Sequence, residues 1–202
     1  MRWAGGALAP DVQAAAGEQG PDAAVLALAA SVPAGSDGLV MLPYLLAERA
    51  PLWDPDLPGA YLGLRRAHTR AHLVRAAAEG VCLQMRMIVD QLDAVKPVES
   101  VRVTGGVFRS ALWREVMAAM LGRSIDIVGT AEGTALGACA LGLFALGRSP
   151  SLADAAAELS VSGPPETVAA DPQLVATYDG LRTSVPELID ALGAVAALLR
   201  PS

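Results

Sequence analysis

Two adjacent glycines near the middle of the chain follow a strand-like run, at a point where the main chain could approach a flat ligand. Gly105 and Gly106 come directly after residues 101–104, which are rich in β-branched side chains. Because glycine has no Cβ atom, it adopts backbone angles closed to other residues and lets a ligand approach the main chain. The helix predicted next would begin with free N–H groups and a partial positive charge. This arrangement is compatible with a nucleotide-binding loop, and equally with a plain turn.

A second unit of the same kind favours the nucleotide-binding interpretation. Residues 124–128 repeat the strand pattern, a turn follows at 129–133, and a helix is predicted from Thr134. Its first residues are small: Gly133, Ala135, Gly137, Ala138 and Ala140. Such a helix could pack close to a sheet or leave room for an adenine ring. Open α/β sheets bind their ligands at the carboxyl ends of the strands, where both turns are expected.

The alternation of strands and helices predicts a parallel α/β sheet. Residues 101–104 and 124–128 should form adjacent parallel strands, joined through a helix at 111–121. Further helices are predicted at 1–17, 22–30, 70–94, 151–158 and 173–199, and short extended segments at 38–45 and 59–64. We expect the last helix to break at Pro186 and a Pro/Gly linker to precede it.

The long helix at 70–94 has a clear start and an apolar face. Thr69 is a plausible N-cap, and His68 and His72 flank it. The two histidines are interpreted as capping and surface groups rather than catalytic ones, because no nucleophile lies near them in sequence. Apolar residues at helical spacing predict the buried face, namely Leu73, Ala76, Ala77, Val81, Met85, Ile88 and Leu92.

The loop at 47–58 carries a dense group of polar and aromatic residues. Its three prolines exclude regular helix. The group comprises Glu48, Arg49, Trp53, Asp54 and Asp56. We interpret it as a surface loop tied by salt bridges, with a lid or substrate rim as the alternative.

Composition limits the possible classes of function. The chain has 202 residues, 53% of them hydrophobic, which suits one domain or a large fragment of one. A net charge of −6 argues against a nucleic-acid partner. The apolar runs are too short to cross a bilayer and no signal peptide is recognisable, so we expect a cytoplasmic protein without a membrane partner. Cys82 and Cys139 are predicted to be buried free thiols. No metal-ligand spacing is present, so no metal site is predicted from the chain alone.

Three segments resemble the FGGY family of carbohydrate kinases, which includes gluconate, xylulose and glycerol kinases. Residues 42–64 read LPYLLAERAPLWDPDLPGAYLGL, similar to L-P-x-x-x-G-E-R-x-P-x-x-x-P followed by R-G-x-x-x-G-L. The family's C-terminal signature is matched by Gly59, Tyr61, Gly63, Leu64, His72, Leu73, Ala76 and Glu79. Residues 105–113 resemble G-G-G-x-x-S-x-x-W and are paired with EGTALGA at 132–138.

The chain also departs from the family pattern. Ala47 stands where glycine is usual, Pro58 replaces an arginine, and Ala78 replaces a larger apolar residue. Val107 replaces the third glycine of the adenosine loop, which bears on how closely a nucleotide approaches. The 202 residues contain none of the family's D-x-G-T, G-x-x-D or G-T-S segments, which carry the phosphate loops and the catalytic base.

The resemblance therefore implies the adenosine end of a kinase site. It assigns nucleotide contacts to Gly105, Gly106, Ser110, Glu132, Gly133 and Gly137. ATP with Mg²⁺ would be the cofactor, and a sugar or sugar acid would bind only together with the family's N-terminal domain. No catalytic residue is assigned, because no carboxylate of the chain lies in the base motif.

These observations combine into one hypothesis with one alternative. The fold class is α/β, a ribonuclease-H or actin-like ATPase domain that forms the C-terminal half of an FGGY sugar kinase and lacks its first strands. The chain would be one partial domain, 1–202, with a nucleotide-binding core at about 38–147 and a helical tail at 150–199. We expect it to be inactive alone and to self-associate through an uncovered sheet edge or apolar face. The alternative is a non-catalytic, kinase-derived binding or interaction module.

Overall fold

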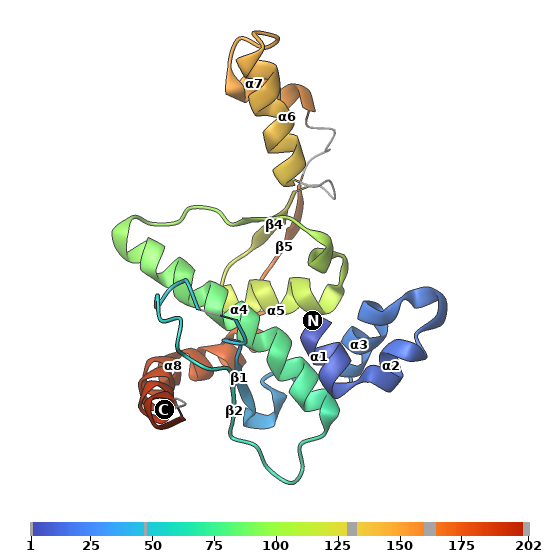
Figure 1. The fold of residues 1–202 in the computed structure, drawn as a ribbon, viewed down its shortest axis with the longest axis vertical. Helices are drawn as coiled ribbons and strands as arrows, with labels where there is room; N and C mark the ends of the chain where they lie inside the picture. The colour runs from blue at the N-terminus through green and yellow to red at the C-terminus, as the bar shows by residue number, and fades with distance from the viewer. Residues whose placement is uncertain (1, 47, 129–132, 160–164, 200–202) are drawn as a thin grey trace.

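A long central helix organises the molecule. The computed structural model describes residues 2–46, 48–128, 133–159 and 165–199. Helix α4 (Arg70–Val95) crosses the body and contacts α3 (Pro21–Ala30), α5 (Ala111–Leu121) and strand β1 (Val40–Leu42). Figure 1 shows the N-terminal helices at one end of α4 and the C-terminal helix α8 (Pro172–Leu199) on the other side of the body.

Capping fixes the start of α4. Thr69 is extended, its side chain accepts from the backbone of His72, and the His72 ring accepts from the Thr69 backbone N–H at 3.1 Å. His72 is thus a capping group, as predicted, but it is buried and also pairs with Asp37 at 3.0 Å. The contacts of this one ring set the direction in which α4 leaves the preceding loop.

The predicted buried face of α4 is partly wrong. Ala76 and Ala77 are buried, but Met85 and Leu92 are 39% and 55% exposed. The face that packs inward includes small and charged residues, because β1 lies very close to the helix. A Cβ atom added at Gly80 would stand 2.0 Å from the Met41 carbonyl oxygen. Close backbone approach, rather than side-chain size, selects the inward face here.

Two small sheets are present in the described residues. Strand β3 (Arg102–Val103) pairs in parallel with β4 (Ile125–Ile127), and α5 connects them, which confirms the predicted strand–helix–strand unit. Strand β5 (Glu166–Val168) pairs antiparallel with β4 and was not predicted, since its segment was interpreted as a linker. Strand β1 pairs antiparallel with β2 (Ala60–Leu62).

Prolines act differently at the two ends of the chain. The predicted helix at 1–17 is divided into α1 (Arg2–Leu8), α2 (Pro10–Ala14) and a 3-10 turn, η1 (Gly17–Gln19). Ala9 precedes Pro10 and leaves helical geometry, with φ −145° and ψ 50°. Helix α8, by contrast, continues through Pro186 where a break was expected. Its buried stripe of Tyr178, Val185, Ile189, Leu192 and Ala196 runs past the proline. Packing of that stripe offsets the roughly 3 kcal/mol cost of an interior proline.

Helices α6 (Gly133–Ala145) and α7 (Leu152–Leu159) pack on each other and stand apart from the body, beyond β4 and β5 (Figure 1). Cys139 on α6 is therefore exposed, which corrects the predicted burial, whereas Cys82 on α4 is buried as predicted. Burial raises the pKa of the Cys82 thiol, so it stays protonated.

The loop at 48–58 is held by one buried carboxylate. Glu48 accepts from the backbone N–H groups of Leu52 at 3.4 Å and Asp54 at 3.2 Å. These backbone hydrogen bonds to one carboxylate shape the described part of the loop. Ala47 lies outside the described residues.

Candidate functional site

The Gly105–Gly106 turn begins a short loop that leads into α5. Gly105 follows β3 with φ 116° and ψ 162°, a backbone conformation that side-chain-bearing residues rarely adopt. Gly106 opens a 3-10 turn, η3 (Gly106–Arg109), and Ser110 is the N-cap of α5. A Cβ atom at Gly106 would meet only the Arg109 guanidinium, at 3.6 Å. Gly105 is thus needed for the turn, and Gly106 leaves open space beside it.

This open space belongs to a cavity of about 830 Å³ between the loop and α3. Such a volume lies within the ordinary range of small-molecule sites. From α3 it is lined by Asp22, Ala23, Leu26, Ala27 and Ala30. From the loop and α5 it is lined by Gly106, Val107, Arg109, Ser110, Ala111, Leu112 and Trp113. Apolar walls with a few polar groups suit a flat heterocycle that carries hydroxyl groups.

Polar groups are available at the start of α5. The Ser110 side chain makes no capping hydrogen bond to the helix, so its hydroxyl and the first N–H groups of α5 are open to a ligand. The indole N–H of Trp113 is buried and has no hydrogen-bond partner among the described residues. The Ser110 hydroxyl is therefore the side-chain donor at the start of α5 that could meet a ligand acceptor, whereas the Trp113 N–H is enclosed by the protein.

The loop is held from outside the cavity by one arginine. Arg114 on α5 donates through Nε to the Phe108 carbonyl within η3. Its Nη1 forms a 2.7 Å ion pair with Glu166 on β5. Arg114 thus ties the loop to the sheet and keeps its shape without entering the cavity lining.

The structure brings some of the predicted site residues together and not others. Gly106 and Ser110 line the cavity, and Gly105 shapes the loop beside it. Glu132 lies outside the described residues, and Gly133 begins α6. Gly137 on α6 is exposed, and a Cβ atom added there would meet no atom within 4 Å. Gly137 does not line this cavity, and its predicted contact with a nucleotide stays a prediction.

Sequence reasoning missed the wall contributed by α3. Asp22, Leu26 and Ala30 recur every four residues, which places them on one helical face. Helix α3 is apolar nearly all round, however, so amphipathicity could not indicate which face borders a cavity.

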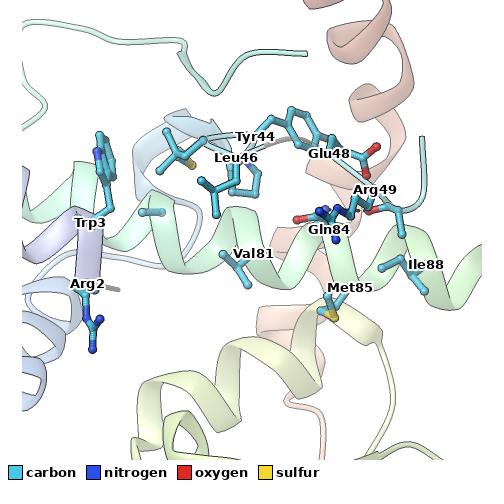
Figure 2. A pocket seen from close by; sticks show the side chains of 16 residues that line it. Arg2, Trp3, Tyr44, Leu46, Glu48, Arg49, Val81, Gln84, Met85 and Ile88 are labelled. Atoms are coloured by element: carbon cyan, nitrogen blue, oxygen red, sulfur yellow. Dashed lines mark hydrogen bonds between the residues drawn. The ribbon is translucent and has the colours of Figure 1, made fainter. Parts of the chain in front are cut away.

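A second cavity of about 850 Å³ lies on the exposed side of α4. Figure 2 shows Val81, Met85 and Ile88 along α4, with Tyr44, Leu46 and Glu48 on the segment across from them. Burial, reinforced by the charge of Glu48, raises the pKa of Tyr44 to about 12, so its phenol stays neutral. The walls of this cavity are mostly apolar, and Leu46 is 87% exposed. Such a surface suits packing against another apolar surface better than it suits chemistry.

Neither a metal cluster nor a membrane span is found in the described part of the chain. Among these residues, no group of three or more His, Cys, Asp or Glu side chains is placed to hold a metal ion. Within the same ranges, no helix is long and apolar enough to span a membrane.

Comparison with known proteins gives the family. Residues 2–146 match the model of the FGGY family of carbohydrate kinases, C-terminal domain. A gluconokinase from Bacillus licheniformis is 41% identical over 126 residues, covering 61% of this chain and 25% of the relative. A glycerol kinase from Bordetella parapertussis is 38% identical over 128 residues, covering 62% of this chain and 25% of the relative. The chain therefore spans about a quarter of the length of these curated relatives.

Solved structures agree in fold. A ligand-bound xylulose kinase from Lactobacillus acidophilus superposes with a TM-score of 0.81 at 28% identity, covering 98% of this chain and 39% of that one. A gluconate kinase from Lactobacillus acidophilus gives 0.75 at 29% identity, covering 91% and 37%. These matches confirm the predicted actin-like ATPase fold and the resemblance read from the three sequence segments. The chain belongs to the FGGY family of carbohydrate kinases, and its residues 2–146 match the C-terminal domain of that family.

Proposed function

We propose that this chain is the nucleotide-binding portion of an ATP-dependent carbohydrate kinase and that it binds the adenosine half of ATP or ADP. One observation carries the proposal: Gly106 and Ser110, which the family resemblance assigns to the adenosine loop, line one cavity of about 830 Å³. Gly105 gives the loop the conformation that opens this cavity.

The lining residues suggest how the adenosine is held. The ring would lie against the Gly106 main chain and the apolar residues Leu26 and Ala27 of α3. The Ser110 hydroxyl and the Asp22 carboxylate are the candidates for hydrogen bonds to the ribose and to the amino group of the base. Contacts to Glu132, Gly133 and Gly137 remain part of the proposal on the strength of the sequence pattern alone.

Carbohydrate kinases of this family use ATP as the phosphate donor, and phosphoryl transfer in general requires Mg²⁺ and a positioned hydroxyl. The described residues do not fit a metal site of their own, since they hold no cluster of three metal-ligating side chains. We therefore assign no metal ligand and no catalytic residue, and we propose that the 202 residues alone transfer no phosphate.

Gluconate is the first candidate substrate, and xylulose or glycerol the next. The gluconokinase relative is 41% identical to this chain, against 38% for the glycerol kinase and 31% for a xylulose kinase from Bacillus subtilis. Each of these matches spans about a quarter of the relative. We propose that the residues that contact the sugar lie in the part of the kinase outside the match.

A non-catalytic nucleotide-binding or interaction module is the second candidate. Val107, which stands in place of the family's third glycine, lines the cavity and is 47% exposed. Its side chain narrows the approach to the main chain and would weaken nucleotide binding relative to a glycine.

A coupled assay of ADP release separates these possibilities. The chain is assayed with ATP, Mg²⁺ and each of gluconate, xylulose and glycerol, alone and with the upstream part of the Bacillus licheniformis gluconokinase. We expect no turnover alone, because losing a general base costs about 10²- to 10⁴-fold. Turnover restored by the added polypeptide supports the kinase function. Sugar-dependent ADP release by the chain alone, lost in Gly106→Val, would show that it contains an unassigned base.

A further inference from the structure

A buried carboxylate on α4 collects hydrogen bonds from three segments of the chain. Glu79 is 2% exposed. Its Oε1 accepts from Arg75 Nε at 2.8 Å, from the Tyr178 hydroxyl at 2.8 Å and from the Gly35 N–H at 2.9 Å. Its Oε2 accepts from the Ser36 hydroxyl at 2.7 Å. The carboxylate is thus fully used, which is the condition under which a buried charge is tolerated.

Arg75 extends this network to the end of α3. Its Nη1 donates to the Val32 carbonyl at 2.9 Å and, at 3.5 Å, to the Ala29 carbonyl. Ala29 lies in the last turn of α3, where backbone oxygens have no partner within the helix and a cation is favourable, and Val32 follows the helix by two residues. The guanidinium therefore links α4 to α3, while Glu79 and Tyr178 hold the guanidinium.

Helix α4 is the shared support of the two cavity walls. It contacts α3, which forms one wall, and α5, whose first turn belongs to the other. Val25 and Ala29 of α3 are fully buried, but apolar packing is non-directional and fixes the position of a helix along its neighbour only weakly. Hydrogen bonds depend on distance and angle, so the bonds of Arg75 fix α3 along α4.

We propose that Arg75, held in place by Glu79 and Tyr178, is a positioning residue that sets the separation between α3 and the Gly106 loop and thereby the affinity for adenosine. This inference rests on the proposed function of the cavity. By this inference α8 also affects the cavity, although it does not line it, because its Tyr178 holds Glu79.

The experiment compares Arg75→Met with Arg86→Met in the full chain. Arg86 is a matched control on the same helix, since it pairs with Asp90 four residues on at 2.6 Å and donates to the Met120 carbonyl at 3.1 Å. Its side chain is 11% exposed, against 9% for Arg75, and Met120 lies near the end of α5 remote from the cavity. Thermal unfolding and the Kd for adenosine are measured for both, at a temperature where both are folded.

We expect both variants to lower the Tm, and only Arg75→Met to weaken adenosine binding, by about tenfold or about 1.4 kcal/mol. A wild-type Kd in Arg75→Met would overturn the proposal, as would an equal loss in Arg86→Met. If Arg75→Met does not fold, Tyr178→Phe takes its place, because it keeps the ring and removes one donor to Glu79. A wild-type Kd in Tyr178→Phe would then overturn it.

Amide hydrogen exchange without ligand separates this inference from the proposed function. If the wild-type chain does not bind adenosine, the proposed function is wrong. The link between Arg75 and α3 is judged independently: faster exchange confined to α3 in Arg75→Met, and absent in Arg86→Met, supports it. Unchanged exchange in α3 would overturn it.

Discussion

Replacing Gly106 with valine should remove ligand binding without disturbing the fold. The backbone at Gly106 is not in the left-handed region, and the nearest atoms to an added Cβ are those of the Arg109 guanidinium, at 3.6 and 4.0 Å. These are ordinary contacts with the flexible end of a long side chain. We therefore expect the free energy of unfolding to change by no more than about 0.5 kcal/mol, as at surface positions.

The effect on binding should be much larger, because the added side chain enters the cavity where the base is proposed to lie. Overpacking a fitted site costs about 1–3 kcal/mol, which corresponds to roughly a 5- to 150-fold increase in Kd. Calorimetry with adenosine, together with thermal unfolding, measures both quantities on the same samples.

Gly6→Val is the matched control for this experiment. Gly6 lies on α1, an added Cβ there meets no atom within 4 Å, and it does not line the cavity. Adenosine should bind this variant as it binds the wild-type chain. Unchanged binding in Gly106→Val, or an equal loss in Gly6→Val, would refute the assignment of the cavity.

Three further predictions concern packing, charge and association. Gly80→Ala should lower the urea midpoint by an amount equivalent to about 1–3 kcal/mol, because the new Cβ would stand 2.0 Å from a main-chain oxygen of β1; a wild-type midpoint would contradict this. The Val98 N–H and the Arg123 guanidinium lower the pKa of Asp93 below its ordinary 3.8. The ionised Asp93 therefore stabilises the folded chain above pH 3.8, and this contribution is lost as the pH falls through the lower pKa of the folded state. The difference in unfolding free energy between the wild type and Asp93→Asn should therefore disappear in acid. The exposed apolar surface around Leu46 should make the chain self-associate, and Leu46→Glu should reduce this in sedimentation experiments; a strictly monomeric wild-type chain over a wide concentration range would refute it.

Local patterns were sufficient to predict the unit formed by β3, α5 and β4. The β-branched runs and the helical spacing between them predicted β3, α5 and β4, because each pattern is satisfied within a few residues. The Gly105–Gly106 turn was predicted for the same reason. The parallel pairing of β3 with β4 then followed from the short connection through one helix.

Features that depend on distant partners could not be predicted in this way. The face of α4 that packs inward is set by β1, which lies about forty residues earlier in the chain and approaches the helix at Gly80. The strand β5 forms because β4 offers it an edge, not because its own sequence is strongly strand-like. Helices α3 and α5 border the same cavity because both pack against α4. No residue spacing within α3 indicates that it lies opposite α5.

The most direct test of the central claim is a calorimetric comparison of adenosine, ADP and ATP on the wild-type chain. The 202 residues contain the loop that we propose holds the adenosine, and they contain neither a D-x-G-T nor a G-T-S segment, which carry the family's phosphate loops. We therefore predict weak binding of all three ligands, with nearly equal affinities. ATP binding far more tightly than adenosine would contradict this, since it would require strong phosphate contacts in this chain, and the absence of binding by any of the three would contradict the assignment of the cavity itself.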